Sequence, residues 1–191
     1  KEVLNQIIDL FMSLSGPGLG RTTKATHYIE VGDAKPFKQR FFPLSPAMQL
    51  HANKALDKML EEGIVRPSTS PWNSPMVLVK KKESGEYRLC FDGRKLNSIT
   101  KKDAYPLPYV SSILDRLRDA HYLSSIDLKQ AFYQVPLHPD SYEKTAFTVP
   151  RRGLFEYTVM PFGIANAPAT QQRLMDNIFG PLLGENIFCY L

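Results

Sequence analysis

The sequence predicts an α+β fold in which a small, mostly antiparallel sheet packs on helices. Strand and helix patterns mix without a regular βαβ rhythm, and two segments have the pattern of β-hairpins. The chain has 191 residues, of which 43% are apolar and 23% charged. These proportions are ordinary for a globular protein that buries a substantial core, and no internal repeat or low-complexity stretch interrupts the chain.

The N-terminal half contains helix signals on either side of an extended segment. Apolar residues recur with weak helical spacing over 5–14, and the prolines of 15–45 favour strand and open coil there. Ser45 and Pro46 provide an N-cap and a first-turn proline for an amphipathic helix, which Gly63 ends. We therefore expect an N-terminal helix, an extended arm and one well-defined helix.

A proline-rich connector leads from this helix into a β-hairpin. Its strands are expected at 76–79 and 87–91, with the basic run 80–82 near the tip. Seven elements should then follow in this order: an amphipathic helix from about residue 108, a strand at 122–128, a short helical turn, a strand near 133–137, a hairpin over 145–159, a helix over 168–179 and a strand at 187–191.

Charge and cysteine content narrow the class of protein. The net charge of +5 suits a polyanionic partner such as nucleic acid without proving one. Cys90 and Cys189 stand far apart without histidine companions, which implies neither a disulfide framework nor a zinc site and fits a reducing compartment. No apolar run approaches the ~20 residues that span a bilayer, so we expect no membrane partner.

Asp127 is the first candidate for chemistry, because it interrupts an apolar strand pattern at 122–128. A bare carboxylate is costly to bury unless a cation or hydrogen-bond donors meet it. Two interpretations stay open from this stretch alone. Asp127 either ends the strand and caps the following turn, or it is an oxygen ligand for a hard metal such as Mg²⁺.

Four motifs in order resemble those of reverse transcriptases. They lie at 127–137 (first polymerase motif), 88–97 (fingers motif), 160–169 (template-grip motif) and 188–191 (opening of the tyrosine-x-aspartate-aspartate motif). The segments 60–68 and 70–75 are also typical of LTR-retrotransposon and retroviral enzymes. The resemblance covers about residues 22–191, and it is to the gypsy class of LTR retrotransposons.

This resemblance implies a right-hand polymerase with fingers and an incomplete palm. It places the fingers at 45–101 and 135–161 and the partial palm at 102–134 and 162–191, after an N-terminal helix and arm at 1–44. The implied activity is RNA-directed DNA synthesis, in which a deoxynucleotide is joined to a primer 3′-hydroxyl on an RNA or DNA template. Two further carboxylates of the family would follow Leu191, so we expect this chain to be inactive alone.

Nucleotide-site residues are implied by the same resemblance. Asp127 would be the catalytic carboxylate that bridges two Mg²⁺ ions, with the Leu128 carbonyl as a further ligand; this chain would hold at most one ion weakly. The remaining nucleotide contacts are the triphosphate clamp of Lys81 and Arg88, the backbone amides of Gln130 and Ala131, the ring of Phe132 that blocks a ribose 2′-hydroxyl, and Phe162, which stands where lentiviral relatives carry glutamine.

Template contacts are implied for Arg94, Asn97, Gly163 and Pro168. Plainer interpretations stand beside several of these roles. The lysine run suits a solvated turn, Phe132 suits a core, and Arg94, Gly163 and Pro168 suit a surface arginine, a turn glycine and a first-turn helix proline.

Partners and location follow from the family as well. We expect an RNA or DNA template-primer and deoxynucleoside triphosphates, in the cytoplasm within a virus-like particle or in the nucleus. A strand at 187–191 without its hairpin partner would favour a dimer or swapped oligomer. Two alternatives remain: a domesticated or truncated retroelement derivative that binds nucleic acid or protein, and an inert remnant of a mobile element.

Overall fold

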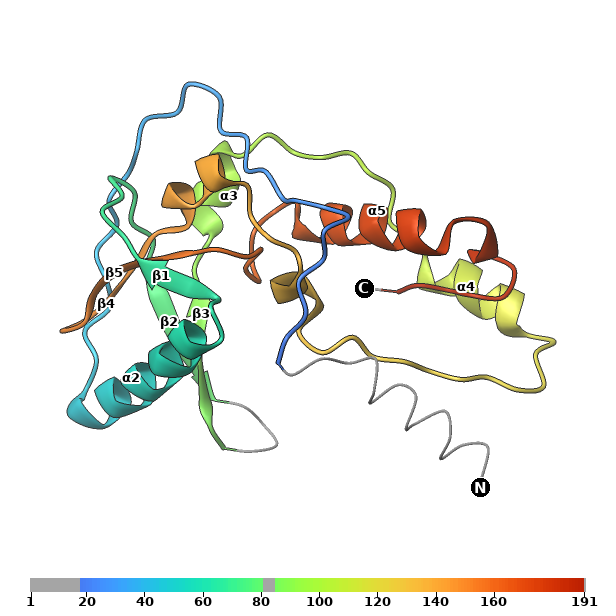
Figure 1. Cartoon of the computed structure of the whole chain (residues 1–191), viewed down its shortest axis with the longest axis horizontal. Coiled ribbons are helices and arrows are strands. Elements are labelled where there is room, and N and C mark those ends of the chain that lie inside the picture. The colour runs from blue at the N-terminus through green and yellow to red at the C-terminus, as the bar shows by residue number, and fades with distance from the viewer. Residues whose placement is uncertain (1–17, 81–84, 191) are drawn as a thin grey trace.

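The computed structural model describes residues 18–80 and 85–190, and its elements form two groups (Figure 1). One group contains all five strands together with helices α2 and α3. The other contains helices α4 and α5 and the C-terminal segment. The helix predicted at 5–14 lies outside the described residues, as does Lys81.

Helix α2 (Pro46–Glu61) confirms the N-cap prediction. The Ser45 hydroxyl accepts a hydrogen bond from the Met48 amide at 3.4 Å, and Pro46 occupies the first turn. Gly63 has φ +62°, a left-handed conformation that suits glycine and ends the helix. Its buried side, which includes Leu56, packs against the sheets.

Both predicted hairpins are present, in two antiparallel sheets. Strands β2 (Met76–Lys80) and β3 (Tyr87–Phe91) form one sheet, and β1 (Val65–Pro67), β5 (Gly153–Tyr157) and β4 (Phe147–Val149) form the other in that order. The sequence did not predict β1, because its proline suggested a connector. Proline is tolerated there since β1 lies at the edge of its sheet.

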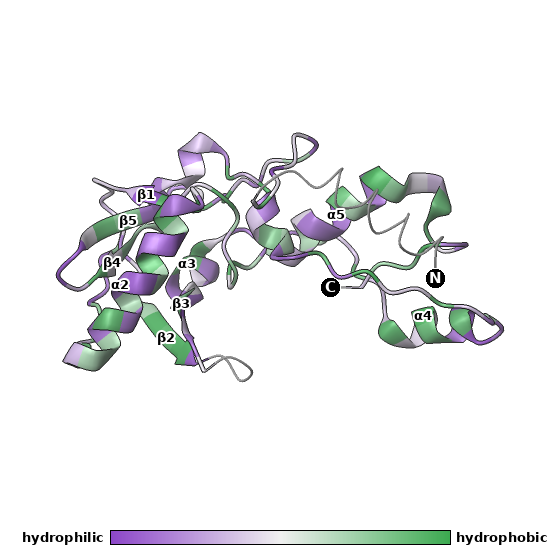
Figure 2. Ribbon diagram, turned by 60° about the horizontal axis from the view of Figure 1, so that its bottom comes forward, coloured by the Kyte–Doolittle hydropathy of each residue, from purple (hydrophilic) through white to green (hydrophobic). Residues whose placement is uncertain are grey.

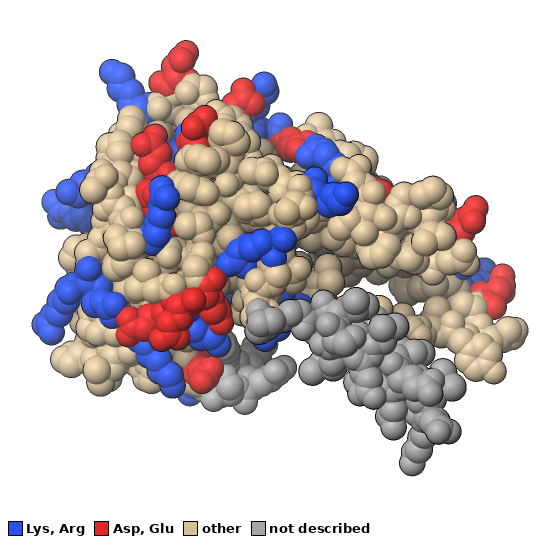
Figure 3. All heavy atoms as spheres, in the orientation of Figure 1, with Lys and Arg blue, Asp and Glu red and all other residues tan. Residues whose placement is uncertain are grey.

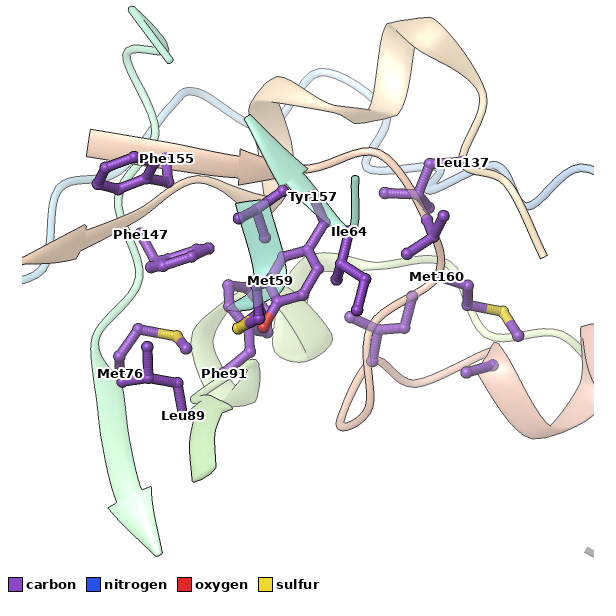
Figure 4. Packing of buried hydrophobic residues seen from close by; sticks show 14 of the residues in the cluster. Met59, Ile64, Met76, Leu89, Phe91, Leu137, Phe147, Phe155, Tyr157 and Met160 are labelled. Carbon is purple, nitrogen blue, oxygen red and sulfur yellow. The ribbon is translucent and has the colours of Figure 1, made fainter. Parts of the chain in front are cut away.

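The hydrophobic core joins the two sheets to α2 and to the start of α5, as the close view shows (Figure 4). Tyr157 is fully buried at its centre, with ring centroids 5.3 Å from Phe147 and 5.9 Å from Phe91. Burying large side chains of this kind contributes about 1.5–3 kcal/mol each. The core therefore fixes the strands that carry the neighbouring site segments.

The remaining helices are short except for α5. The helix predicted at 168–179 is confirmed as α5 (Ala167–Phe179), with Pro168 in its first turn. Helix α3 (Arg94–Ile99) was not predicted, since six residues offer too little helical periodicity. The others are α4 (Val110–Leu117) and the 3₁₀ turns η1 (Ala131–Gln134), η2 (Pro139–Ser141), η3 (Glu143–Thr145) and η4 (Gly180–Leu182).

The N-terminal arm (residues 18–44) is mostly open coil and crosses from one group of elements to the other, drawn in blue in Figure 1. The His27 amide donates to the Pro136 carbonyl at 2.9 Å, and the Ile29 amide donates to the Ser141 hydroxyl at 2.9 Å. The His27 ring is 3% exposed and its Nδ1 lies 2.8 Å from the Thr170 hydroxyl on α5. The arm thus ties α5 to the rest of the chain.

Three strand predictions were wrong. Residues 122–128 form no strand and are exposed, with Tyr122 96% and Ile126 73% exposed. Within 183–190 the described bridge pairs Leu183 with Ile187, and no strand forms. Near 133–137 only Pro136 and Leu137 form bridges, since Tyr133 belongs to η1. An extended segment needs a ladder partner, and in the described ranges none runs beside 122–128. Self-association through a C-terminal strand stays a prediction.

Helix α4 stands apart from the core (Figure 2). The predicted amphipathic helix is present, but it contains no buried residue, and Val110 and Leu114 are 46% and 62% exposed. Within 18–80 and 85–190 no helix is long and apolar enough to span a bilayer.

Candidate nucleotide and template site

Three aromatic rings from two distant segments meet at the junction of the two groups. The ring centroids of Phe132 and Phe162 are 4.9 Å apart with an interplanar angle of 40°. Tyr133 meets Phe162 edge-on at 5.2 Å and stacks on the buried Tyr157 at 6.3 Å. Burial raises the pKa of Tyr133 to about 12. The cluster is thereby anchored to the core through Tyr133.

The first of these segments turns sharply just before the rings. Gln130 has φ +50°, a left-handed conformation that costs a non-glycine residue on the order of 1 kcal/mol. Two hydrogen bonds hold the turn: the Tyr133 amide donates to the Gln130 carbonyl at 2.9 Å, and the Gln134 side chain donates to the Lys129 carbonyl at 2.9 Å. Ala131 begins η1 immediately after this turn.

The second segment is a loop, residues 160–166, held by the side chain of Asn97. The Asn97 amide nitrogen donates to the Gly163 carbonyl at 2.7 Å, and its oxygen accepts from the Ala165 amide at 2.8 Å. Gly163 has φ +91°, which disfavours any side chain there. A side chain on Gly93 would meet the Gly163 carbonyl at 2.8 Å. Helix α3 and the loop are therefore in close backbone contact.

Asn166 makes a second link of the same kind. Its side-chain nitrogen donates to the Lys101 carbonyl at 2.8 Å, and its oxygen accepts from the Asp103 amide at 3.1 Å. Asp103 in turn accepts from Arg173 on α5 at 2.8 Å. Sequence reasoning missed Asn166, although an asparagine just before a helix with proline in its first turn is a recognisable signal.

Arg94 forms an ion pair with Asp92, two residues earlier in the chain. Its guanidinium donates twice to the Asp92 carboxylate, at 2.8 and 2.7 Å. These hydrogen bonds lower the pKa of Asp92 below its usual value. The Arg94 side chain is still 85% exposed. An exposed guanidinium of this kind can meet a phosphate while keeping its carboxylate partner.

The other predicted residues do not join this cluster through any described contact. Arg88 is exposed on β3, paired in register with Val79 on β2. Asp127 lies on the exposed segment 122–128, and Leu128 is 45% exposed. Pro168 lies in the first turn of α5. The roles proposed for these residues stay predictions.

A family model for reverse transcriptase (RNA-dependent DNA polymerase) matches residues 79–191. The chain belongs to the reverse transcriptase family. Retrovirus-related Pol polyproteins of Drosophila melanogaster are similar over nearly the whole chain. That of transposon 297 is 37% identical over 98% of the chain, and that of transposon gypsy is 34% identical over 94%. The predicted likeness to gypsy-type LTR elements is thereby confirmed.

The chain also matches solved structures of this family. A prototype foamy virus protease-reverse transcriptase superposes with a TM-score of 0.83 at 26% identity, over 97% of this chain. A second foamy viral structure, in complex with an RNA/DNA hybrid, matches with a TM-score of 0.80 at 23% identity and supports the fold. The predicted α+β fold is confirmed. The chain spans 18% of the transposon 297 polyprotein and 25% of the foamy virus chain.

Reverse transcriptases generally use Mg²⁺, and Asp127 and Leu128 are the candidate ligands in this chain. The Asp127 carboxylate and the Leu128 carbonyl are oxygen donors of the kind Mg²⁺ prefers. In the described ranges, however, no three His, Cys, Asp or Glu side chains lie close enough together to hold a metal ion. The described part of the chain therefore offers Mg²⁺ the Asp127 carboxylate and the Leu128 carbonyl as oxygen donors.

Proposed function

We propose that this chain supplies the nucleotide-contacting and template-contacting part of an RNA-directed DNA polymerase. Family membership supports the reaction class. The observation that carries the proposal is the meeting of Phe132 and Phe162, 30 residues apart in sequence, in one half-exposed ring pair beside a loop held by α3. Rigidly placed aromatic surface next to open solvent is suited to a base and sugar.

In the proposed reaction the primer 3′-hydroxyl oxygen forms a bond to the α-phosphorus of the incoming triphosphate. The bond to pyrophosphate breaks, and the hydroxyl proton passes to solvent. Bound Mg²⁺ would supply charge neutralisation at the phosphate oxygens. Asp127 and Leu128 are the residues of this chain proposed to face it, and the two further carboxylates of the family would come from the longer protein.

The other roles follow the family motifs. Lys81 and Arg88 would hold the triphosphate, and the amides of Gln130 and Ala131 would meet its oxygens. The ring of Phe132 would exclude a ribose 2′-hydroxyl by contact.

On the template side, Arg94 and the loop from Gly163 to Pro168 would meet the strand, with Asn97 holding that loop in place. The net charge of +5 supports a polyanionic partner. Figure 3 shows that Lys and Arg side chains on this face of the strand-containing group are interspersed with Asp and Glu.

The activity test uses a longer protein that continues beyond the chain as its relatives do. Asp127→Asn should abolish primer extension, because the amide cannot ligate a cation as a carboxylate does. The matched control is Asp119→Asn, which changes another exposed carboxylate eight residues earlier. Retained synthesis in Asp127→Asn would refute the catalytic assignment.

Nucleic-acid binding is tested on the 191-residue chain itself. Fluorescence anisotropy with a labelled RNA/DNA primer-template should show an affinity that falls as salt rises. Arg94→Ala should reduce the slope of log affinity against log salt by about 1. Arg118→Ala is the control, since Arg118 is likewise exposed and paired with a nearby aspartate. Binding by the longer protein without synthesis would favour a non-catalytic derivative.

A further inference from the structure

We infer that Phe162 is a positioning residue that holds the ring of Phe132 in place and thereby sets the discrimination between deoxyribonucleotides and ribonucleotides. The inference rests on the proposed function, in which Phe132 excludes the 2′-hydroxyl. It differs from a direct role in binding, because Phe162 acts on the nucleotide through the ring of Phe132.

Phe162 cannot recognise a sugar hydroxyl by hydrogen bonding, because its side chain has no polar atom. Its ring is nevertheless 49% exposed, so burial alone does not account for its position. Its described ring contacts are Phe132 at 4.9 Å and Tyr133 at 5.2 Å. Phe162 therefore acts through van der Waals and edge contacts with the aromatic residues of η1.

The backbones that carry the two rings are fixed against each other. The Met160 amide donates to the Val135 carbonyl at 2.8 Å, and the Leu137 amide donates to the Thr158 carbonyl at 3.0 Å. These bonds join the segments just beyond Phe132 and just before Phe162. With both backbones held, removal of one ring leaves space that the other can occupy by side-chain rotation.

Asn97 fixes the backbone that follows Phe162. Its two hydrogen bonds bracket the peptide units of Gly163 and Ala165, immediately after the ring. Tyr133 is held in turn by stacking on Tyr157, which is 1% exposed. The half-buried Phe132 thus has a rigid wall on the side of Phe162. A ring held in this way resists displacement by an added 2′-hydroxyl, whereas a free ring turns aside.

Nucleotide discrimination in the longer protein provides the first test. The measured quantity is the ratio of kcat/KM for a deoxynucleotide to that for the matching ribonucleotide. Phe162→Leu should lower this ratio by about tenfold, the equivalent of an aromatic pair contact. Phe162→Tyr keeps the ring and should restore it. Phe41→Leu is the control, because Phe41 is 45% exposed and lies beside β2 rather than η1.

A purely structural role for Phe162 would lower kcat/KM for both nucleotides equally and leave the ratio unchanged, which would overturn the inference. Failure of the proposed function is a different result, namely that the unchanged longer protein extends no primer with deoxynucleotides.

If the longer protein extends no primer, a double-mutant cycle in the 191-residue chain still tests whether Phe162 holds Phe132. Phe132→Ala, Phe162→Ala and the double variant are compared by urea unfolding, followed by the fluorescence of Trp72. Coupling should change the unfolding equilibrium constant about 2- to 10-fold beyond additivity. Strict additivity would show that Phe162 does not hold Phe132.

Discussion

Acid should destabilise the chain through His27, the buried histidine of the N-terminal arm. Burial lowers the pKa of His27 from 6.5 to about 4, and Asp103 offsets this only in part. The folded state therefore keeps the imidazole neutral at pH values where the unfolded chain takes up a proton. This contribution to stability is complete above about pH 6.5 and is lost as the pH falls toward 4. At about 1.4 kcal/mol for each unit of pKa, the loss is about 3 kcal/mol.

Urea unfolding between pH 7.5 and pH 4 measures this loss, with the single tryptophan, Trp72, as the probe, since it is 3% exposed in the folded chain. The quantity of interest is the free energy of unfolding of the unchanged chain minus that of His27→Gln, because the carboxylates titrate equally in both proteins. The difference should shrink by about 3 kcal/mol over this range. His121→Gln, at an exposed position, serves as the control. Parallel profiles for His27→Gln and the unchanged chain would refute the reasoning.

Two substitutions test contacts of the sheet and the site. Arg66→Ala leaves Glu156, which is 6% exposed, with the Ser68 hydroxyl as its remaining partner among the described residues. The free energy of unfolding should therefore fall by about 2–3 kcal/mol in urea titrations. Arg152→Ala breaks an ion pair to the half-exposed Asp57 and should cost less than about 1 kcal/mol, and equal losses in the two variants would contradict this. Gly163→Ala forces a side chain into φ +91° with its Cβ 3.2 Å from the Phe91 carbonyl, so the free energy of unfolding, measured by thermal unfolding, should fall by about 1–3 kcal/mol. Gly20→Ala, with open space around it, should be near neutral. An unchanged Tm for Gly163→Ala would show that the loop relaxes freely.

The sequence correctly predicted the elements whose ends are marked by capping or turn residues. Helix α2 begins at Pro46 after the Ser45 cap, and the hairpin of β4 and β5 turns where Gly153 follows two arginines. These features depend on neighbours in sequence. The strand predicted at 122–128 is absent because a strand needs a neighbouring strand to pair with. The apolar pattern around Ile126 does not indicate whether such a neighbour exists.

For the candidate site, the sequence named individual residues but not the contacts between them. Family motifs pointed to Phe132, Phe162 and Asn97 individually. That Phe162 packs on Phe132, and that Asn97 binds the loop of Gly163 with both polar atoms, depends on segments brought together by the core. Sequence patterns report local periodicity, and pairing between residues 30 to 70 positions apart lies beyond it.

The long sequence distance between the N-terminal arm and its partners has a consequence for synthesis on the ribosome. Ile29 is bound by Ser141 and Lys144, and His27 by Thr170, which lie 112, 115 and 143 residues later in the chain. At a translation rate of about 5–20 residues per second, His27 is made roughly 7–30 s before Thr170 exists. Throughout that interval His27 is in nascent polypeptide without this partner, open to chaperones and proteases, whereas Gln39 of the same arm can already pair with Asn73. Docking of the part of the arm around His27 and Ile29 is therefore a late event in the maturation of the chain.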